Sequence, residues 1–239
     1  MATSTRVAKA LRLAGDSIAG SFAAMRIVHI ETLINRGPFS KSKRWRALRD
    51  QAHAAVRGVD WPPGTGKFTI YPESGKKRGK GNGVRPIRDA AIARLTDAKP
   101  KYSKLGRKPK DEWVSECPWP VGERVRPGNM DAAYVWNDGL VCLEWETGNI
   151  SSSHRSLNKM CLGLQRRRLK AGMLVVPSRK LAAYLTDRVG NVGELEPYYD
   201  FWRTTPCDEG VLQVIVIEQD GESLDVPRIR KGTDGRALA

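Results

Sequence analysis

Residues 131–149 read DAAYVWNDGLVCLEWETGN, in which Asp131, Glu144 and Glu146 flank a turn signal within an otherwise apolar stretch. The NDG at 137–139 is a strong turn signal between two β-prone runs, so it predicts a β-hairpin. With DG as the two loop residues, Asp131 lies opposite Glu146. Strand alternation then places the apolar side chains on one face and Asp131, Glu144 and Glu146 together on the other.

Three acids on one face of a hairpin need compensation. Like charges across a hairpin are destabilising, and carboxylates on a half-buried sheet face do not all stay ionised without a positive partner. Oxygen-rich clusters suit Mg²⁺ or Mn²⁺, whereas zinc calls for His or Cys ligands, which this cluster lacks. The hairpin therefore predicts a divalent metal site, with three acids at a wet strand edge as the alternative.

The charge balance points to a polyanionic partner. Lys and Arg number 41 against 26 Asp and Glu, so the formal net charge of the 239 residues is +15. Such an excess is more than solubility needs and favours nucleic acid as a partner, with a generically basic surface as the alternative. The four scattered cysteines are typical of reduced thiols, and no run is long enough to span a membrane, so we expect a cytoplasmic protein.

The pattern of apolar and turn residues predicts an α/β protein with a mixed central β-sheet flanked by helices. A strand, a helix and a strand in succession after the hairpin indicate a parallel pair. We expect two helices over 26–55, a strand at 67–71, a helix at 88–95, a mostly irregular segment at 98–128, a helix at 153–170 capped by Ser152 or Ser153 and ended by Gly172, a strand at 172–177, a helix from 178 and a strand at 211–218.

An Asp, a spacer and then acid-x-acid across a hairpin resembles the active site of the PD-(D/E)xK nuclease superfamily. In particular it resembles the variant in which Glu replaces the usual Lys, as in the restriction endonuclease group of BamHI, BglII and BstYI. Similar stretches, together about 25–218, are MRIVHIETLINR, KFTIYPESGKKRGKGNGVRPIRDAAIARL and AGMLVVPSRKLAAYLTDRVGNVGELEPYYDFW. We expect a restriction-endonuclease-like fold in one domain over 25–239, preceded by an extension over 1–24 with helix as its expected form.

The resemblance implies roles for the acids. Asp131 and Glu144 would bind the metal, and Glu146, where the superfamily has Lys, would be a second ligand or orient the attacking water. Glu cannot supply the positive charge of Lys, so stabilisation of the transition state would rest more on the metal and on other basic groups. Glu31 is a candidate fourth carboxylate that spacing does not establish.

The resemblance also implies DNA contacts after the acid-x-acid strand and in two loops. Asn149 can read adenine, and Ser can contact bases or phosphate or cap a helix. The loop at 74–83 is a candidate DNA clamp, with a flexible basic linker as the alternative, and His154 is expected to be a surface or phosphate-contacting residue. The candidates are Lys76, Lys77, Arg78, Lys80, Asn82, Asn149, Ser151, Ser152, His154, Arg155, Arg188 and Asn191.

The leading hypothesis is a Mg²⁺-dependent type II restriction endonuclease that cuts double-stranded DNA as a homodimer at a short palindrome. By resemblance the palindrome would contain GATC or a related core. Mn²⁺ would substitute for Mg²⁺, Ca²⁺ would support binding without cleavage, and a cognate DNA methyltransferase would protect the host. The alternatives are a repair or mobile-element nuclease of the same fold and a noncatalytic nucleic-acid-binding protein.

Overall fold

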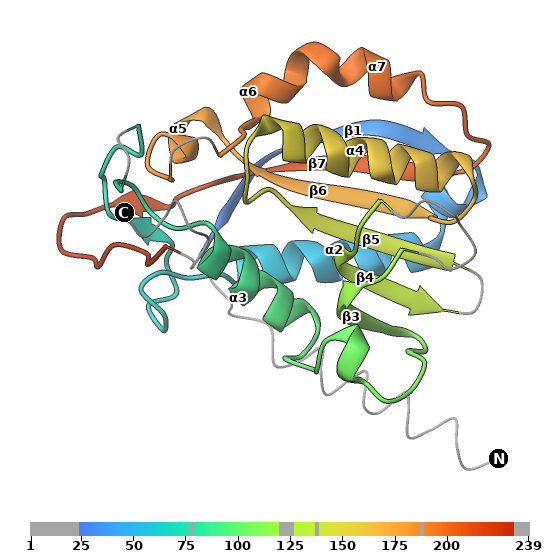
Figure 1. Cartoon of the computed structure of the whole chain (residues 1–239), viewed down its shortest axis with the longest axis horizontal. Coiled ribbons are helices and arrows are strands. Elements are labelled where there is room, and N and C mark those ends of the chain that lie inside the picture. The colour runs from blue at the N-terminus through green and yellow to red at the C-terminus, as the bar shows by residue number, and fades with distance from the viewer. Residues whose placement is uncertain (1–23, 77–78, 120–126, 137–138, 187–188, 232–239) are drawn as a thin grey trace.

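The structure is a computed structural model and describes residues 24–76, 79–119, 127–136, 139–186 and 189–231 (Figure 1). Its centre is a six-stranded sheet of order β1-β7-β6-β5-β4-β3, and a second sheet pairs β2 with β8. The strands are β1 (Arg26–Arg36), β2 (Thr69–Ile70), β3 (Glu112–Cys117), β4 (Met130–Trp136), β5 (Gly139–Trp145), β6 (Ala171–Pro177), β7 (Gly210–Glu218) and β8 (Gly221–Glu222). The helices are α2 (Lys43–Arg57), α3 (Arg85–Leu95), α4 (Ile150–Gln165), α5 (Arg179–Ala182), α6 (Val192–Leu195) and α7 (Tyr199–Arg203), with 3-10 turns at Pro38–Lys41, Tyr102–Lys104 and Glu196–Tyr198.

The sheet is mixed, as the sequence predicts. β5, β6 and β7 run parallel to one another, while β1 pairs antiparallel with β7, and β4 pairs antiparallel with both β5 and β3. β6 is buried along its whole length, which explains its nearly continuous apolar sequence AGMLVVP. A strand covered on both faces has no reason to alternate apolar and polar residues.

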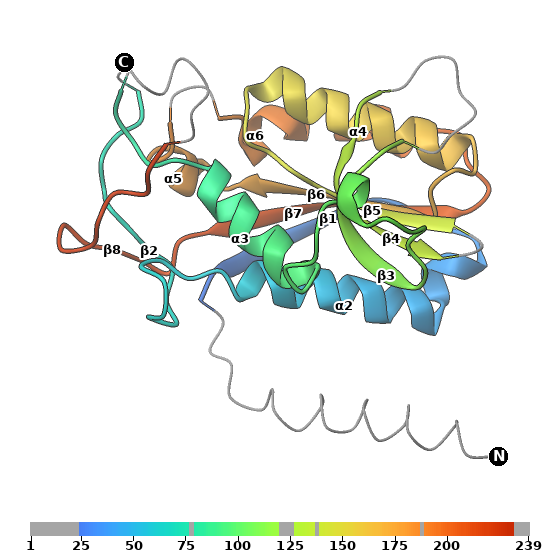
Figure 2. The ribbon, with the colours of Figure 1, turned by 60° about the horizontal axis from the view of Figure 1, so that its bottom comes forward.

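Helices cover both faces of the sheet. Figure 2 shows α2 and α3 on one side and α4 and α6 on the other. The first face packs Leu143 and Val175 against Trp45 of α2 and Ile87 of α3. The second face packs Leu174 and Val214 against Leu157 and Leu164 of α4, and against Leu195 and Trp202 of α6 and α7. The resulting three layers confirm the expected α/β fold.

One predicted element is wrong, and the prediction for a second segment omits a strand. The segment 26–36 was expected to be helical but forms the edge strand β1, because Ile27, Ile30 and Ile34 fit helical spacing and strand pairing alike, and pairing with β7 decides the outcome. The segment 98–128 was expected to be mostly irregular, yet it contains β3, which is paired with β4.

The helix after the hairpin was predicted correctly, but its ends were not. α4 begins at Ile150 with Asn149 as its N-cap residue, and it ends at Gln165. Ser152 and Ser153 therefore lie inside the first turn rather than before it. Gly172 does not end the helix but lies in β6, where an added Cβ would lie 2.5 Å from the sulfur of Met160. The glycine thus lets α4 approach the sheet closely.

The hairpin forms with a register two residues away from the predicted one. Trp136 pairs with Gly139 and Ala132 pairs with Leu143, so the connecting residues are 137–138, which lie outside the described part of the chain. Extending this register places Asp131 opposite Glu144, and the predicted pairing with Glu146 is wrong. A shift of two residues leaves every side chain on its original face, so the grouping of the three acids survives the error.

Candidate active site

The three acids lie where β4 begins and β5 ends, beneath the first turns of α4. All three line one pocket of about 350 Å³, together with Ser152, Arg155 and Lys159 of α4. The pocket forms at this edge because antiparallel pairing brings the start of β4 beside the end of β5, and α4 follows β5 after a connection of only a few residues. The sequence prediction brought the acids to one face, and the helix closes the pocket above them.

Asp131 is half-buried and held by two groups. Its Oδ2 accepts a hydrogen bond of 2.8 Å from the backbone N–H of Trp145, and its Oδ1 lies 3.6 Å from Nη1 of Arg88 on α3. Burial raises the pKa of Asp131, while the hydrogen bond from Trp145 and the charge of Arg88 partly oppose the rise. Asp131 thus faces a cation from the opposite layer of the fold.

Glu144 is buried, and its Oε1 forms an ion pair with Nζ of Lys159. The same ammonium group donates a hydrogen bond of 2.9 Å to the backbone carbonyl of Asn129. Burial raises the pKa of Glu144 to about 7, although the ammonium of Lys159 acts in the opposite direction. The carboxylate therefore depends on Lys159 for its charge balance in this structure.

Glu146 is 2% exposed and faces no cation among its hydrogen-bond partners. Its Oε1 accepts a hydrogen bond of 2.5 Å from the backbone N–H of Gly148, and its Oε2 accepts one from Oγ of Ser153. Burial raises its pKa to about 7, and the two hydrogen bonds offset only part of that rise. Ser153, one of the two residues expected to cap the helix, instead orients this carboxylate.

The three carboxylates are chemically suited to a hard divalent cation, but their present arrangement is not. Three carboxylates in one pocket are the oxygen ligands that Mg²⁺ and Mn²⁺ prefer. Yet within the described residues no three His, Cys, Asp or Glu side chains are grouped closely enough to hold a metal ion. The partners named above explain why: each carboxylate is turned toward its own protein group rather than toward a common point.

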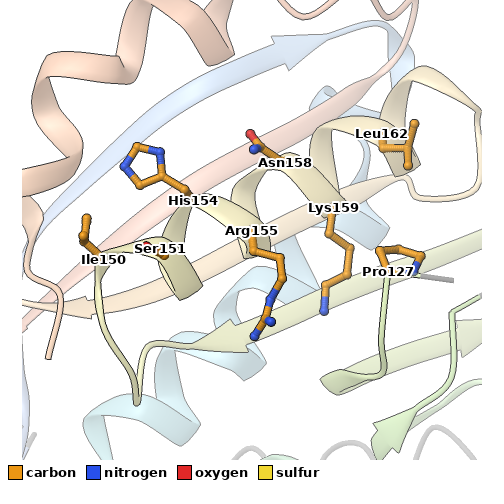
Figure 3. Close-up of a pocket in the computed structure, with 8 residues that line it drawn as sticks. All are labelled: Pro127, Ile150, Ser151, His154, Arg155, Asn158, Lys159 and Leu162. Atoms are coloured by element: carbon orange, nitrogen blue, oxygen red, sulfur yellow. The ribbon is translucent and has the colours of Figure 1, made fainter. Parts of the chain in front are cut away.

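The start of α4 presents several of the predicted DNA-contacting residues on the surface. Asn149, Ser151 and Arg155 are exposed, and Ser152 is partly buried in the wall of the acidic pocket. In Figure 3, Arg155 and Lys159 leave α4 on the same side, whereas His154 points away from them. Arg155 therefore lies between the acidic pocket and a neighbouring pocket of about 580 Å³ along the helix.

His154 belongs to an aromatic cluster. Its ring lies 4.6 Å from the ring of Tyr198 in an edge-on arrangement and 5.2 Å from the ring of Trp202. Trp202 also donates a hydrogen bond to Asn158 of α4. These contacts tie α4 to α7, so His154 serves packing between the two helices in this structure.

The basic loop at 74–83 contains both exposed cations and a buried amide. Lys76 and Lys80 are exposed, and Lys80 lies 3.2 Å from Glu73. Lys77 and Arg78, also predicted to contact DNA, lie outside the described residues. Asn82 is completely buried and joins three segments: its amide donates to the carbonyls of residues 71 and 184 and accepts from the N–H of residue 229. Because its hydrogen-bonding groups are used inside the protein, the interpretation of Asn82 as a base reader is not supported by its geometry.

Of the remaining candidates that the structure describes, neither Asn191 nor Glu31 lines the acidic pocket. Asn191 caps α6 through its side chain and forms a capping box with Glu194. Arg188 lies outside the described residues. Glu31 lies on the opposite edge strand β1, where it forms an ion pair of 2.8 Å with Arg203, so in this structure it is not part of the acidic pocket.

Sequence reasoning missed two cations at the acids. Neither Lys159, which lies in the helix predicted over 153–170, nor Arg88, which lies in the helix predicted over 88–95, was among the expected site residues. A signal for Lys159 was available, because it follows Arg155 by four residues and positions i and i+4 share one helix face. Arg88 carries no such signal, since only the packing of α3 against the sheet brings it to Asp131.

Two kinds of comparison relate the chain to known proteins. A family profile described as "Restriction endonuclease BamHI" matches residues 25–236. The type II restriction enzyme OkrAI of Oceanobacter kriegii is 39% identical over 214 residues, which cover 90% of this chain and 100% of that protein. The type II restriction enzyme BamHI of Bacillus amyloliquefaciens is 32% identical over 202 residues, covering 82% of this chain and 85% of that protein. Among the described residues no helix is long and apolar enough to cross a membrane.

Proposed function

Since the chain belongs to the BamHI family of type II restriction endonucleases, and so is a sequence-specific DNA endonuclease, we propose that the pocket of Asp131, Glu144 and Glu146 is its active site. The observation that carries the proposal is that three buried or half-buried carboxylates line one pocket at the end of β5. We also propose that residues 25–239 form the single endonuclease domain, with 1–24 as an extension.

The proposed cofactor is Mg²⁺, with Mn²⁺ as a substitute and Ca²⁺ supporting binding without cleavage. Asp131 and Glu144 would hold the ion, with Glu146 as a further ligand or as the group that orients the attacking water. A bound divalent cation would polarise the phosphate and lower the pKa of water. The chain's own contribution is to hold the carboxylates: Trp145 positions Asp131, and Gly148 and Ser153 position Glu146.

The proposed DNA-binding face lies around the start of α4. Asn149 and Ser151 are exposed at the first turn and are placed to contact bases or phosphates, and Arg155 lies beside the acidic pocket. The exposed cations of the loop at 74–83 would hold the DNA backbone from another side. His154 and Asn82 leave this proposed set, because their side chains serve internal contacts.

We further propose that the protein acts as a homodimer through α4 and the segment 196–203. Phe201 is 69% exposed and Tyr198 is 50% exposed, and large aromatic side chains exposed side by side are typical of interaction surfaces. Both flank Trp202, which packs against α4. A two-fold dimer would supply one acidic pocket for each strand of a duplex, which suits a palindromic site.

The test is cleavage of unmethylated phage DNA by the purified full chain, with Mg²⁺ and with chelator, followed by sequencing of the fragment ends. Discrete fragments that require Mg²⁺ and share one palindrome, expected to contain GATC or a related core, would support a restriction enzyme guarded by a methyltransferase. Cleavage without a common end sequence would favour the relaxed repair or mobile-element nuclease. Intact DNA with Mg²⁺, despite tight binding, would contradict the assignment of the pocket as an active site.

A further inference from the structure

Lys159 carries a positive charge into the acidic pocket. Its side chain is only 6% exposed, although lysine is rarely buried without a partner. The ammonium group reaches Oε1 of Glu144 and the carbonyl oxygen of Asn129, which lies just before β4. The lysine therefore links α4 to both strands of the hairpin at the position of the acids.

This ion pair explains why the acids do not converge. Glu144 is central among the proposed ligands, since the observed register places it opposite Asp131 and two residues before Glu146. Its carboxylate is turned toward Lys159, and the described residues contain no group of three acids in metal-binding geometry. A divalent cation bound to Glu144 would lie beside the ammonium group of Lys159. Two neighbouring positive charges in a partly desolvated pocket repel each other strongly.

We propose that Lys159 is an internal counter-ion, which holds the cation position beside Glu144 and gives it up when a divalent metal binds. This inference rests on the proposed function, because it takes Glu144 as a metal ligand. In this structure the Lys159 side chain leaves α4 on the same side as that of Arg155 (Figure 3).

Arg88 is a weaker candidate for the same role. Its Nη1 lies 3.6 Å from Asp131, which is beyond hydrogen-bonding distance, and its guanidinium already donates to Asp89 at 2.6 Å. Among the described residues, Lys159 in contrast has the carboxylate of Glu144 as its ionic partner and the backbone carbonyl of Asn129 as its other acceptor. The ion pair that must break before Glu144 can bind a metal is therefore the one with Lys159.

The test compares Ca²⁺ binding, measured by calorimetry without DNA, in the wild-type chain and in Lys159→Met. The proposal predicts at least tenfold tighter Ca²⁺ binding in Lys159→Met, because the variant removes the competing charge and leaves the carboxylates in place. Lys170→Met is the matched control, since Lys170 pairs with Glu209 near the opposite end of β5, and its Ca²⁺ affinity should equal that of wild type. Unchanged or weaker Ca²⁺ binding in Lys159→Met would overturn the proposal.

A second measurement needs no variant and decides the matter if Lys159→Met fails to fold. Amine labelling of the wild-type chain, read by mass spectrometry, should modify Lys159 slowly without metal and at least several-fold faster with Ca²⁺, while the exposed Lys180 changes little. Equal labelling of Lys159 under both conditions would overturn the proposal. Cleavage with Mg²⁺ is recorded on the same wild-type preparation. Metal-dependent cutting with unchanged Lys159 labelling would reject this inference alone. If the wild-type chain neither binds Ca²⁺ nor cuts DNA, the proposed function is rejected too.

Discussion

Replacing Glu146 with Gln should make the metal-free protein more stable at alkaline pH and leave its stability at acidic pH nearly unchanged. Burial raises the pKa of Glu146 from 4.5 to about 7, and one pKa unit corresponds to about 1.4 kcal/mol. Ionising this carboxyl group therefore costs the fold up to about 3 kcal/mol. Because the pKa is raised in the folded state, the stabilising effect of the protonated form is complete below pH 4.5 and is lost as pH rises through about 7.

The assay is thermal unfolding of wild type and Glu146→Gln in chelator at several pH values from 5 to 8. In a domain of this size about 1 kcal/mol shifts the melting temperature by about 2–4 °C, so the variant should melt roughly 6–12 °C higher than wild type at pH 8. The amide can keep both contacts, because its oxygen still accepts from the backbone N–H of Gly148 and its NH2 group can donate to the hydroxyl oxygen of Ser153. Asp97→Asn is the control, because Asp97 has an 82% exposed side chain and a positive φ that Asn tolerates. A stability difference between Glu146→Gln and wild type that does not vary with pH would refute the reasoning.

Three further outcomes follow from the structure. Arg155→Ala should weaken DNA binding about equally for cognate and unrelated duplexes, and it should lower by about 1 the slope of log binding constant against log salt concentration. Fluorescence titration in Ca²⁺ at several salt concentrations measures both effects. A loss confined to the cognate duplex would show that Arg155 reads bases instead. Phe201→Glu should convert a dimer to a monomer in sedimentation velocity. The melting temperature of the monomer should not fall, because the side chain is 69% exposed. An unchanged sedimentation coefficient would exclude this surface as the dimer interface. Leu157→Ala should lower the free energy of unfolding by about 2–5 kcal/mol in denaturant titration, because Leu157 is fully buried between α4 and the sheet, and a loss below 1 kcal/mol would contradict that packing.

The hairpin shows which features of the site the sequence could specify. Strand alternation is a local property, so it placed Asp131, Glu144 and Glu146 on one face correctly. The pairing partner of Asp131 was predicted wrongly, because NDG is compatible with more than one two-residue loop. The error moved Asp131 by two positions along the partner strand and left the face unchanged.

Elements decided by distant contacts were predicted less well. The segment 26–36 is a strand because it pairs with β7, which lies nearly two hundred residues later in the chain. In the same way, Asn82 looked like a polar reader in a basic loop, whereas its burial depends on backbone groups near residues 71, 184 and 229. Residue patterns do not contain these partners, so only the folded chain reveals them.

The cations at the site illustrate an intermediate case. Lys159 could have been placed from the helical spacing that relates it to Arg155, once α4 was known to cover the acids. Its burial and its contact with Glu144 depend on how closely the helix approaches the sheet, which Gly172 permits. The sequence thus predicted that the three carboxylates lie together but not which cations lie beside them.

The central claim, that Asp131, Glu144 and Glu146 form the metal-dependent cutting site, is tested most directly by single-turnover cleavage of a cognate duplex in Mg²⁺. Wild type is compared with Asp131→Asn, Glu144→Gln and Glu146→Gln, and DNA binding of each is measured in Ca²⁺. We expect each substitution to slow cleavage by a factor on the order of 10³, while DNA affinity stays within a few-fold of wild type. Cleavage at the wild-type rate by any of the three variants would contradict the account.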